Sequence, residues 1–264
     1  MAIHPTAVVD RRAEIDPSVE IGPYVVIDGP VVVGAGTRLL PYVHLTGDTA
    51  IGRDNVIGSG AVIGGEPQDL SYAGAPTGVR IGDRNRIREH AEINRATKLE
   101  RPTTLGDDGF LMSHSHIGHD CQVGNGVILA SGALLAGHVA VGDRAFISGN
   151  CVVHQFVRVG RLAILRGLSR TSRDVPPFAV MDWTHTVRGI NRVGLRRAGF
   201  STERIRSVQR AFTTLFGSRR NLRQALAEVE AGARSAEVDE VVAFIRASTR
   251  GVCFGPSGQA VGEE

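Results

Sequence analysis

The chain has 264 residues, of which 42% are hydrophobic, 5% aromatic and 22% charged, and its formal net charge is +3. This hydrophobic content supports one large packed domain or two smaller ones and excludes a disordered chain. A charge of +3 without any nucleic-acid motif gives no reason to expect nucleic-acid binding, and no run of about 20 apolar residues marks a membrane span. The N-terminal segment lacks the features of a signal peptide, so we expect a cytoplasmic protein.

Glycine is abundant, with 33 residues, whereas aromatic residues are scarce. This composition favours an architecture with many tight turns and a narrow core over an ordinary α/β sandwich. The three cysteines, Cys121, Cys151 and Cys253, are too few and too widely spaced for a disulfide framework or a CxxC metal site. We therefore expect small buried thiols and no bound metal.

A branched aliphatic residue returns every six positions through most of the chain up to Leu165. Representative hexads begin at Ile51, Ile81 and Val141. A period of six matches neither the 3.6 residues of a helix nor the alternation of a single strand. We predict that each hexad forms a short strand and a turn, that three hexads close one triangular coil, and that coils stack about 4.8 Å apart. Residues 18 positions apart would then lie directly above one another.

The repeat breaks at 65–80 and again at 99–104. Breaks in a solenoid usually map to loops on one face, which is often the binding face. We expect the first break to be such a loop. The second is compatible with either an irregular hexad or an excursion from the coil.

The hexads end after Leu165, and the prolines at 175–178 mark a boundary. The pattern beyond them predicts helices, with Ser201 and Ser235 as the N-caps of the second and the fourth. These helices are expected at 191–198, 202–216, 222–231 and 236–247.

This pattern divides the chain into a β-solenoid followed by a helical part. The predicted units are a β-helix domain over 1–175, a C-terminal helical domain over 176–251 and a disordered tail over 252–264.

The densest cluster of side chains with catalytic potential lies in the stretch SHSHIGHDCQVG, at 113–124. Its members are His114, His116, His119 and Asp120. A single histidine is usually structural, but a histidine can also act as a general base near neutral pH. Four such side chains in one coil indicate a functional site.

Stacking at 18 positions places Gly137 above His119 and His138 above Asp120. A glycine above a histidine leaves room for a reacting group and exposes a backbone N–H to a developing oxyanion. Asp120 would orient a histidine and stabilise its charged form. The alternative is a plain hydrogen bond between Asp120 and His138 in neighbouring coils.

The chain resembles the UDP-N-acetylglucosamine O-acyltransferases, the family that performs the first acyl transfer of lipid A biosynthesis, over residues 3–251. The resemblance is carried by QDLSYAGAPT at 68–77, IGDRNRIRE at 81–89, HIGHDCQVGN at 116–125, LAGHV at 135–139, VVHQF at 152–156, DVPPF at 174–178, GLRRAGFS at 194–201 and ASTRG at 247–251. It implies that the solenoid is an all-β, left-handed parallel β-helix with a C-terminal α-helical domain, whereas the repeat by itself leaves the hand open.

The resemblance also implies roles for residues of this chain. His119 would be the general base, supported by Asp120, with the Gly137 amide at the oxyanion. The hydroxyl would attack the thioester directly, without an acyl-enzyme, since no serine or cysteine nucleophile motif competes. The implied substrate contacts are Gln68, Asp69, Ser71, His116, His138, His154 and Gln155 for sugar and acyl chain, Asn191, Arg196 and Arg197 for the nucleotide, and Gly167 with His185 for acyl-chain length.

The implied partners are a UDP-sugar substrate and an acyl carrier protein, whose thioester is the acyl donor. No other cofactor is expected, and the family's sites between neighbouring subunits imply a homotrimer. An acidic carrier protein would dock on arginines of the helical part. These arginines are Arg196, Arg197, Arg204, Arg206, Arg210, Arg219 and Arg220.

Three residues depart from the family pattern: Ser71 replaces a usual lysine, Val193 a glutamate, and Asn94 a frequent histidine. Each departure removes a charge or a titratable group near the expected substrate. The chain is therefore also compatible with a diverged paralogue that acylates a 3-amino UDP-sugar.

An alternative of another class is a γ-type carbonic anhydrase, which also uses a left-handed β-helix trimer and binds zinc through histidines across a subunit interface. His114, His116 and His119 are the candidate ligands. Against this alternative, that family lacks the sugar-binding stretches and the long helical tail.

Overall fold

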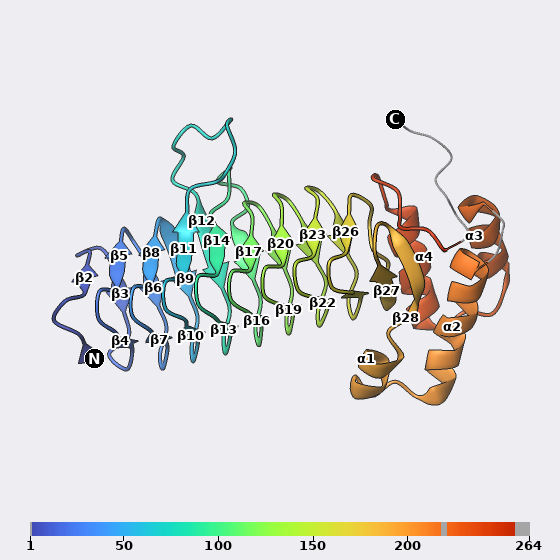
Figure 1. Ribbon diagram of the computed structural model, residues 1–264, viewed down its shortest axis with the longest axis horizontal. Coiled ribbons are helices and arrows are strands. Elements are labelled where there is room, and N and C mark those ends of the chain that lie inside the picture. The colour runs from blue at the N-terminus through green and yellow to red at the C-terminus, as the bar shows by residue number, and fades with distance from the viewer. Residues whose placement is uncertain (1, 218–220, 257–264) are drawn as a thin grey trace.

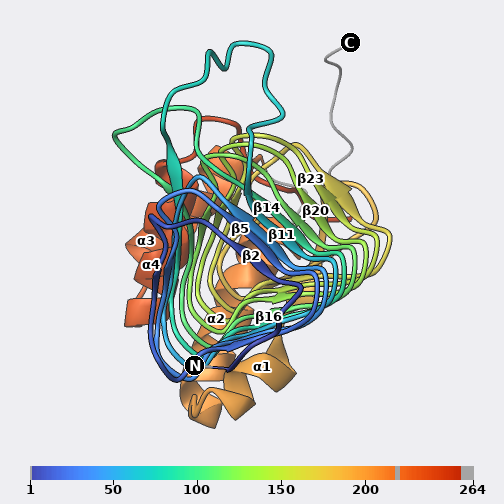
Figure 2. The same ribbon diagram turned by 90° about the vertical axis from the view of Figure 1, so that its left-hand side faces the viewer.

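The computed structural model describes residues 2–217 and 221–256, and Figure 1 shows a long solenoid with helices at its C-terminal end. Arg219, Arg220 and the predicted tail beyond 256 lie outside the described residues. The solenoid is a left-handed parallel β-helix with three sheets, so the predicted fold class is confirmed. Viewed along its axis in Figure 2, each coil is a triangle with one sheet on each side.

The first sheet has 11 strands. They are β1 (Ala2–Ile3), β4 (Glu20–Ile21), β7 (Arg38–Leu39), β10 (Val56–Ile57), β13 (Arg86–Ile87), β16 (Phe110–Leu111), β19 (Ile128–Leu129), β22 (Phe146–Ile147), β25 (Ile164–Leu165), β27 (Ala179–Asp182) and β28 (Thr186–Ile190). The second has nine strands. They are β2 (Val8–Val9), β5 (Val26–Asp28), β8 (His44–Thr46), β11 (Val62–Gly65), β14 (Glu92–Asn94), β17 (His116–Ile117), β20 (Leu134–Leu135), β23 (Val152–Val153) and β26 (Arg170–Thr171).

The third sheet has eight strands. They are β3 (Glu14–Ile15), β6 (Val32–Val33), β9 (Asp48–Ile51), β12 (Gly78–Ile81), β15 (Thr103–Leu105), β18 (Gln122–Val123), β21 (Ala140–Val141) and β24 (Arg158–Val159). The second residue of a typical strand is the repeated aliphatic one and points into the coil, where for example Ile57, Leu111 and Leu135 are fully buried. These stacked side chains form the narrow core that the repeat predicts.

The strand register confirms the predicted stacking and locates both breaks. Phe110 pairs with Ile128, 18 positions on. Across the first break Val56 pairs with Arg86, so this loop adds 12 residues to a coil, and it projects from the solenoid between β11 and β12 (Figure 1). Across the second, Arg86 pairs with Phe110, which is 24 positions away. The second break is thus an excursion of six extra residues, not an irregular hexad.

The solenoid ends in a hairpin that the sequence pattern did not reveal. Strand β27 extends the parallel ladder by pairing with β25, and β28 returns antiparallel to β27. Val252 and Cys253 are buried, and the Cys253 N–H donates to the Asp174 carbonyl. This part of the predicted tail is therefore ordered against the last coil.

The helices lie close to the predicted ranges. They are α1 (Arg192–Arg197), α2 (Thr202–Gly217), α3 (Leu222–Ala231) and α4 (Ala236–Arg246). The Ser201 hydroxyl accepts a hydrogen bond from the Arg204 N–H, and Ser235 occupies the N-cap position of α4 without a side-chain cap bond. Among the described residues no helix is both long and apolar enough to cross a membrane.

Aromatic and cationic side chains fasten the helical part to the solenoid. Phe178 is fully buried and meets Phe200, which precedes α2, at 5.9 Å between ring centroids. The Arg161 guanidinium lies over both rings, 4.8 and 5.6 Å from their centroids. The helices are therefore anchored to the last coils. A two-domain division remains our proposal.

Candidate active site

A buried histidine and its carboxylate neighbour form the centre of the site. His119 and Asp120 occupy the turn after β17, and His119 is only 7% exposed. Its Nδ1 lies 2.8 Å from Asp120 Oδ2. Asp120 has a left-handed backbone (φ 59°), a conformation that aspartate tolerates better than most residues. The turn therefore directs the carboxylate of one residue onto the ring of the residue before it.

The turn one coil above brings Gly137 and His138 to this pair, as predicted. The His138 N–H donates to the His119 carbonyl at 2.8 Å. His138 Nε2 is 3.6 Å from Asp120 Oδ2, and its ring stacks on Phe156 with 4.6 Å between centroids. Asp120 thus pairs more closely with His119 in its own turn than with His138 in the next coil.

Gly137 lets the His119 ring pack directly against its backbone. A Cβ at this position would collide with Cε1 and Nε2 of that ring. The neighbouring amides of Ala136 and His138 donate to backbone oxygens, whereas within the described part of the chain the Gly137 N–H donates to none. An unpaired N–H next to a histidine is the arrangement that an oxyanion site requires.

The first loop contributes Asp69 on the other side of the His119 ring. Asp69 Oδ2 lies 4.0 Å from His119 Nε2, the nitrogen that does not contact Asp120. The backbone N–H and hydroxyl of Ser71 both donate to Asp69 Oδ1 at 2.8 Å. These two hydrogen bonds lower the pKa of Asp69 and keep it ionised. Ser71 therefore orients Asp69, and in this structure it has no charge of its own to offer a substrate.

A pocket of about 540 Å³ adjoins this centre. Its polar part includes Gln68, Glu92 and His116, and its apolar part is formed by Leu134, Leu135, Ala136 and Val152. The first loop and strands β14 and β17 supply the polar part, whereas β20, the turn after it and β23 supply the apolar part. The pocket is therefore amphipathic along the solenoid axis.

Glu92 is a residue of this pocket that the sequence did not single out. His116 Nδ1 is 3.4 Å from Glu92 Oε2, and this hydrogen bond is the main reason that the pKa of Glu92 is lowered. The buried Asn94 amide donates to Glu92 Oε1 at 2.9 Å. The signal that would have found Glu92 is its register with His116, 24 positions on, but this requires the length of the second excursion.

Two further predicted residues lie near the centre. His154 and Gln155 occupy the turn above Gly137, since the Phe156 N–H donates to the Gly137 carbonyl.

Val193, which departs from the family pattern, is exposed at the start of α1.

The two residues predicted to govern acyl-chain length lie near the last coils. Gly167 follows β25, and a Cβ there would meet only the Gly149 carbonyl, at 3.7 Å. His185 accepts a hydrogen bond from the Ser172 N–H, and burial lowers its pKa. Space at Gly167 is thus available for a ligand.

The predicted nucleotide residues divide into two kinds. Asn191 is buried and caps α1: its side-chain oxygen accepts from the Gly194 N–H and its amide donates to the Leu162 carbonyl. Its position favours anchoring of α1 over direct contact with a nucleotide. Arg196 and Arg197 lie in the last turn of α1.

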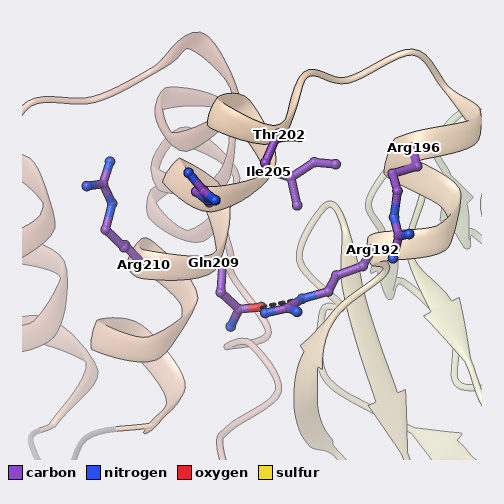
Figure 3. Close-up of a pocket in the computed structure, with 7 residues that line it drawn as sticks. Arg192, Arg196, Thr202, Ile205, Gln209 and Arg210 are labelled. Atoms are coloured by element: carbon purple, nitrogen blue, oxygen red, sulfur yellow. Dashed lines mark hydrogen bonds between the residues drawn. The ribbon is translucent and has the colours of Figure 1, made fainter.

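A second pocket, of about 570 Å³, lies between α1 and α2 (Figure 3). Its lining residues are Arg192, Arg196, Thr202, Ile205, Arg206, Gln209 and Arg210. Arg192 donates to the side-chain oxygen of Gln209, and the pocket lining carries no carboxylate. This pocket is suited to an anionic partner.

Within the described residues one group could hold a metal ion: His119, Asp120 and His138, whose ligand atoms lie within 4.8 Å of one another. His114, His116 and His119, the trio considered for zinc, do not form such a group among the described residues of one chain, and the His114 ring stacks on His90 with 5.1 Å between centroids. The metal-capable group is the same one that suits acid–base chemistry.

Comparison with known proteins agrees with this geometry. Residues 174–253 match the family model "Udp N-acetylglucosamine O-acyltransferase; Domain 2", and residues 30–65 match the bacterial transferase hexapeptide model. The acyl-[acyl-carrier-protein]–UDP-N-acetylglucosamine O-acyltransferase of Janthinobacterium sp. (strain Marseille) is 45% identical over 95% of this chain and 98% of its own. That of Thermodesulfovibrio yellowstonii is 43% identical, with the same coverage.

Solved structures give the same result. The UDP-N-acetylglucosamine acyltransferase of Francisella novicida superimposes with a TM-score of 0.92 at 34% identity, covering 99% of this chain and 100% of its own. The Bacteroides fragilis enzyme has a TM-score of 0.90 at 39% identity, covering 95% and 99%. These likenesses extend over the solenoid and the helical part together. The chain therefore belongs to the UDP-N-acetylglucosamine O-acyltransferase family, which is the predicted family and not the carbonic anhydrase alternative.

Proposed function

We propose that this protein transfers an acyl chain, including 3-hydroxyacyl chains, from the thioester of an acyl carrier protein to the 3-hydroxyl of UDP-N-acetylglucosamine, as in lipid A biosynthesis. The observation that carries the proposal is the buried His119, which is hydrogen-bonded at Nδ1 to Asp120 and packs against Gly137, whose N–H donates to no backbone oxygen among the described residues. Family membership indicates the substrate class. The three residues offer a general base, a carboxylate that orients it and an N–H that can stabilise an oxyanion.

His119 acts as the general base. Its Nδ1–H donates to Asp120, which leaves the lone pair of Nε2 free for the sugar hydroxyl. As Nε2 removes the proton, the hydroxyl oxygen forms a bond to the thioester carbon. Asp120 stabilises the imidazolium that results, as the carboxylate of a catalytic triad does.

The Gly137 N–H stabilises the oxyanion of the tetrahedral intermediate. One donor of this kind contributes about 10²–10³-fold in rate in related acyl-transfer sites. When the intermediate collapses, the carbon–sulfur bond breaks and the imidazolium of His119 returns its proton to the leaving thiolate. The sugar hydroxyl attacks directly, so no acyl-enzyme and no cofactor beyond the carrier thioester takes part.

The amphipathic pocket separates the two parts of the product. Gln68 and His116 contact the sugar, together with Asp69, while Leu134 and Val152 lie along the acyl chain. His138, His154 and Gln155 complete the substrate contacts from the stacked turns above His119. Gly167 and His185 lie where the length of the acyl chain is governed, and the glycine leaves room for a longer chain.

The arginines of the helical part bind the anionic partners. Arg196 and Arg197 contact the diphosphate group of the UDP-sugar. Arg206 and Arg210 attract the acidic surface of the acyl carrier protein. Reversal of one of these charges, as in Arg206→Glu, should raise KM for the acyl carrier protein with little change in KM for the UDP-sugar. The effect should diminish at high salt.

The exposed apolar side chains of the upper coils support a homotrimer. Leu134, Val152 and Phe156 are between 41% and 50% exposed beside the site. Contiguous apolar surface of this kind is typical of a subunit interface. Measurement of the mass in solution by light scattering tests the trimer. A cytoplasmic location remains a prediction.

The deciding experiment incubates the purified protein with UDP-N-acetylglucosamine and a panel of acyl carrier proteins of different chain length, and identifies the product by mass. We expect an ester product with wild-type protein and a loss of turnover of about 10²–10⁴-fold in His119→Ala, with substrate binding retained. Retained turnover in His119→Ala would refute the general base. The 3-amino UDP-sugar, offered in parallel, tests the paralogue, because its amide product survives hydroxylamine whereas an ester is cleaved.

A further inference from the structure

The second excursion, which links β14 to β15, begins with two residues, Arg95 and Thr97, that contact separate parts of the site. It adds six residues to its coil and so carries the backbone away from the sheet between Asn94 and Thr103. The proposed mechanism gives it no role. Arg95 lies against the first loop, and Thr97 lies against Asp120.

Arg95 holds both the base and the middle of the first loop. Its side chain is 14% exposed. It donates to the Gly64 carbonyl at 2.9 Å, to Glu66 Oε1 at 3.0 Å and to the Tyr72 hydroxyl at 3.2 Å. The guanidinium also lies over the Tyr72 ring, 5.6 Å from its centroid. These contacts flank Gln68 and Asp69 on both sides, so one side chain fixes the loop segment that faces the pocket.

Thr97 holds the carboxylate of Asp120. Its backbone N–H is 3.1 Å from each carboxylate oxygen, and its hydroxyl donates to Oδ2 at 2.8 Å. That Oδ2 is the oxygen that contacts His119 Nδ1. At the far end of the excursion, Thr103 Oγ1 accepts from the Asp120 N–H at 2.8 Å. The excursion is therefore hydrogen-bonded to both the side chain and the backbone of Asp120.

We infer that Arg95 and Thr97 form one positioning element, which holds Asp69 and Asp120 at opposite ring nitrogens of His119. Asp69 is 4.0 Å from Nε2 and Asp120 is 2.8 Å from Nδ1, so both carboxylates are set by the same short segment. The inference rests on the proposed function of His119. Its physical basis is that hydrogen bonds behind a catalytic group fix the orientation on which proton transfer depends.

The element predicts a division of kinetic effects. Thr97→Val removes one charge-assisted hydrogen bond and keeps the volume, so kcat should fall roughly tenfold while KM for the UDP-sugar stays near the wild-type value. Thr97→Ser should restore kcat. Arg95→Gln releases the loop, so KM for the UDP-sugar should rise roughly tenfold, with a smaller change in kcat.

Matched controls come from the same chain. Thr104→Val also removes a threonine hydroxyl bond, to Gln122 on the third sheet, and Arg38→Gln removes an exposed pair with Glu20. Both should leave kcat and KM unchanged. Equal losses in Thr97→Val and Thr104→Val, or no rescue by Thr97→Ser, would show a general effect on folding and overturn the inference.

A readout without turnover separates this inference from the proposed function. Amide hydrogen exchange at 66–77 should be faster in Arg95→Gln and unchanged in Thr97→Val, and the ring nitrogen signals of His119 in ¹⁵N NMR should change in Thr97→Val. If wild-type protein makes no acyl-sugar, the proposed function fails while these two measurements still decide the positioning. The inference is overturned, whatever the activity, if hydrogen exchange at 66–77 and the ¹⁵N signals of the His119 ring stay as in the wild-type protein in both variants.

Discussion

The close packing of His119 against Gly137 gives the sharpest prediction, through Gly137→Ala. Gly137 does not have a left-handed backbone, so alanine introduces no conformational strain there. Its Cβ would nevertheless lie inside van der Waals contact with Cε1 and Nε2 of His119, and 3.0 Å from Nδ1. The ring would have to withdraw by about 1 Å, and a displacement of that size at a reacting group costs roughly 100-fold in rate. The withdrawal also strains the 2.8 Å contact with Asp120.

The assay is kcat at saturating acyl carrier protein and UDP-sugar, with the melting temperature measured in parallel. Gly232→Ala is the control, because a Cβ there meets its nearest atom, the Val229 carbonyl oxygen, at 3.7 Å. We expect kcat to fall roughly 100-fold in Gly137→Ala and to stay unchanged in Gly232→Ala, with both variants folded. A Gly137→Ala protein that keeps its kcat would refute the dependence of the reaction on the position of the His119 ring.

Two further predictions concern stability. Phe178→Ala empties a fully buried site beside Phe200 and should lower the free energy of unfolding by about 3–5 kcal/mol, measured by chemical denaturation; a loss below about 1 kcal/mol would contradict the anchoring of the helical part. Because the hydrogen bond with His116 lowers the pKa of Glu92 from 4.5, its contribution to stability is present above pH 4.5 and is lost as the pH falls through the lowered pKa. When the pH is lowered from about 6 to about 3, the melting temperature should therefore fall less in Glu92→Gln than in the wild-type protein. Equal falls in the two proteins would argue against the pair of Glu92 and His116.

The hexad pattern determined a large part of the structure, because the spacing of residues along the chain fixes which strands pair. Where no break intervenes, three hexads make one coil, and the pairing of Phe110 with Ile128 repeats along the solenoid. Gly137 and His138 could therefore be placed over His119 and Asp120 by counting alone. The helices were likewise predictable, because their ranges are local patterns: α2, α3 and α4 begin after serine or asparagine, and α2 and α3 end at glycine.

Counting failed wherever the chain leaves the coil. The loop that brings Asp69 to His119, and the shifted register that pairs Glu92 with His116, depend on how many residues each break adds. The β27–β28 hairpin pairs neighbouring segments but lies outside the six-residue period. The return of Cys253 to the last coil depends on a contact with Asp174, which no local period encodes.

The sequence by itself thus determined the coil, its core and the stacked turn that places Gly137 over His119, because six residues per side is a local rule repeated along the chain. Only the tertiary structure decided what surrounds that turn. Asp69 and Thr97 reach the His119–Asp120 pair from two excursions whose paths are set by packing and hydrogen bonding, not by the repeat. The site is therefore a predictable scaffold position completed by contacts that only the folded chain reveals.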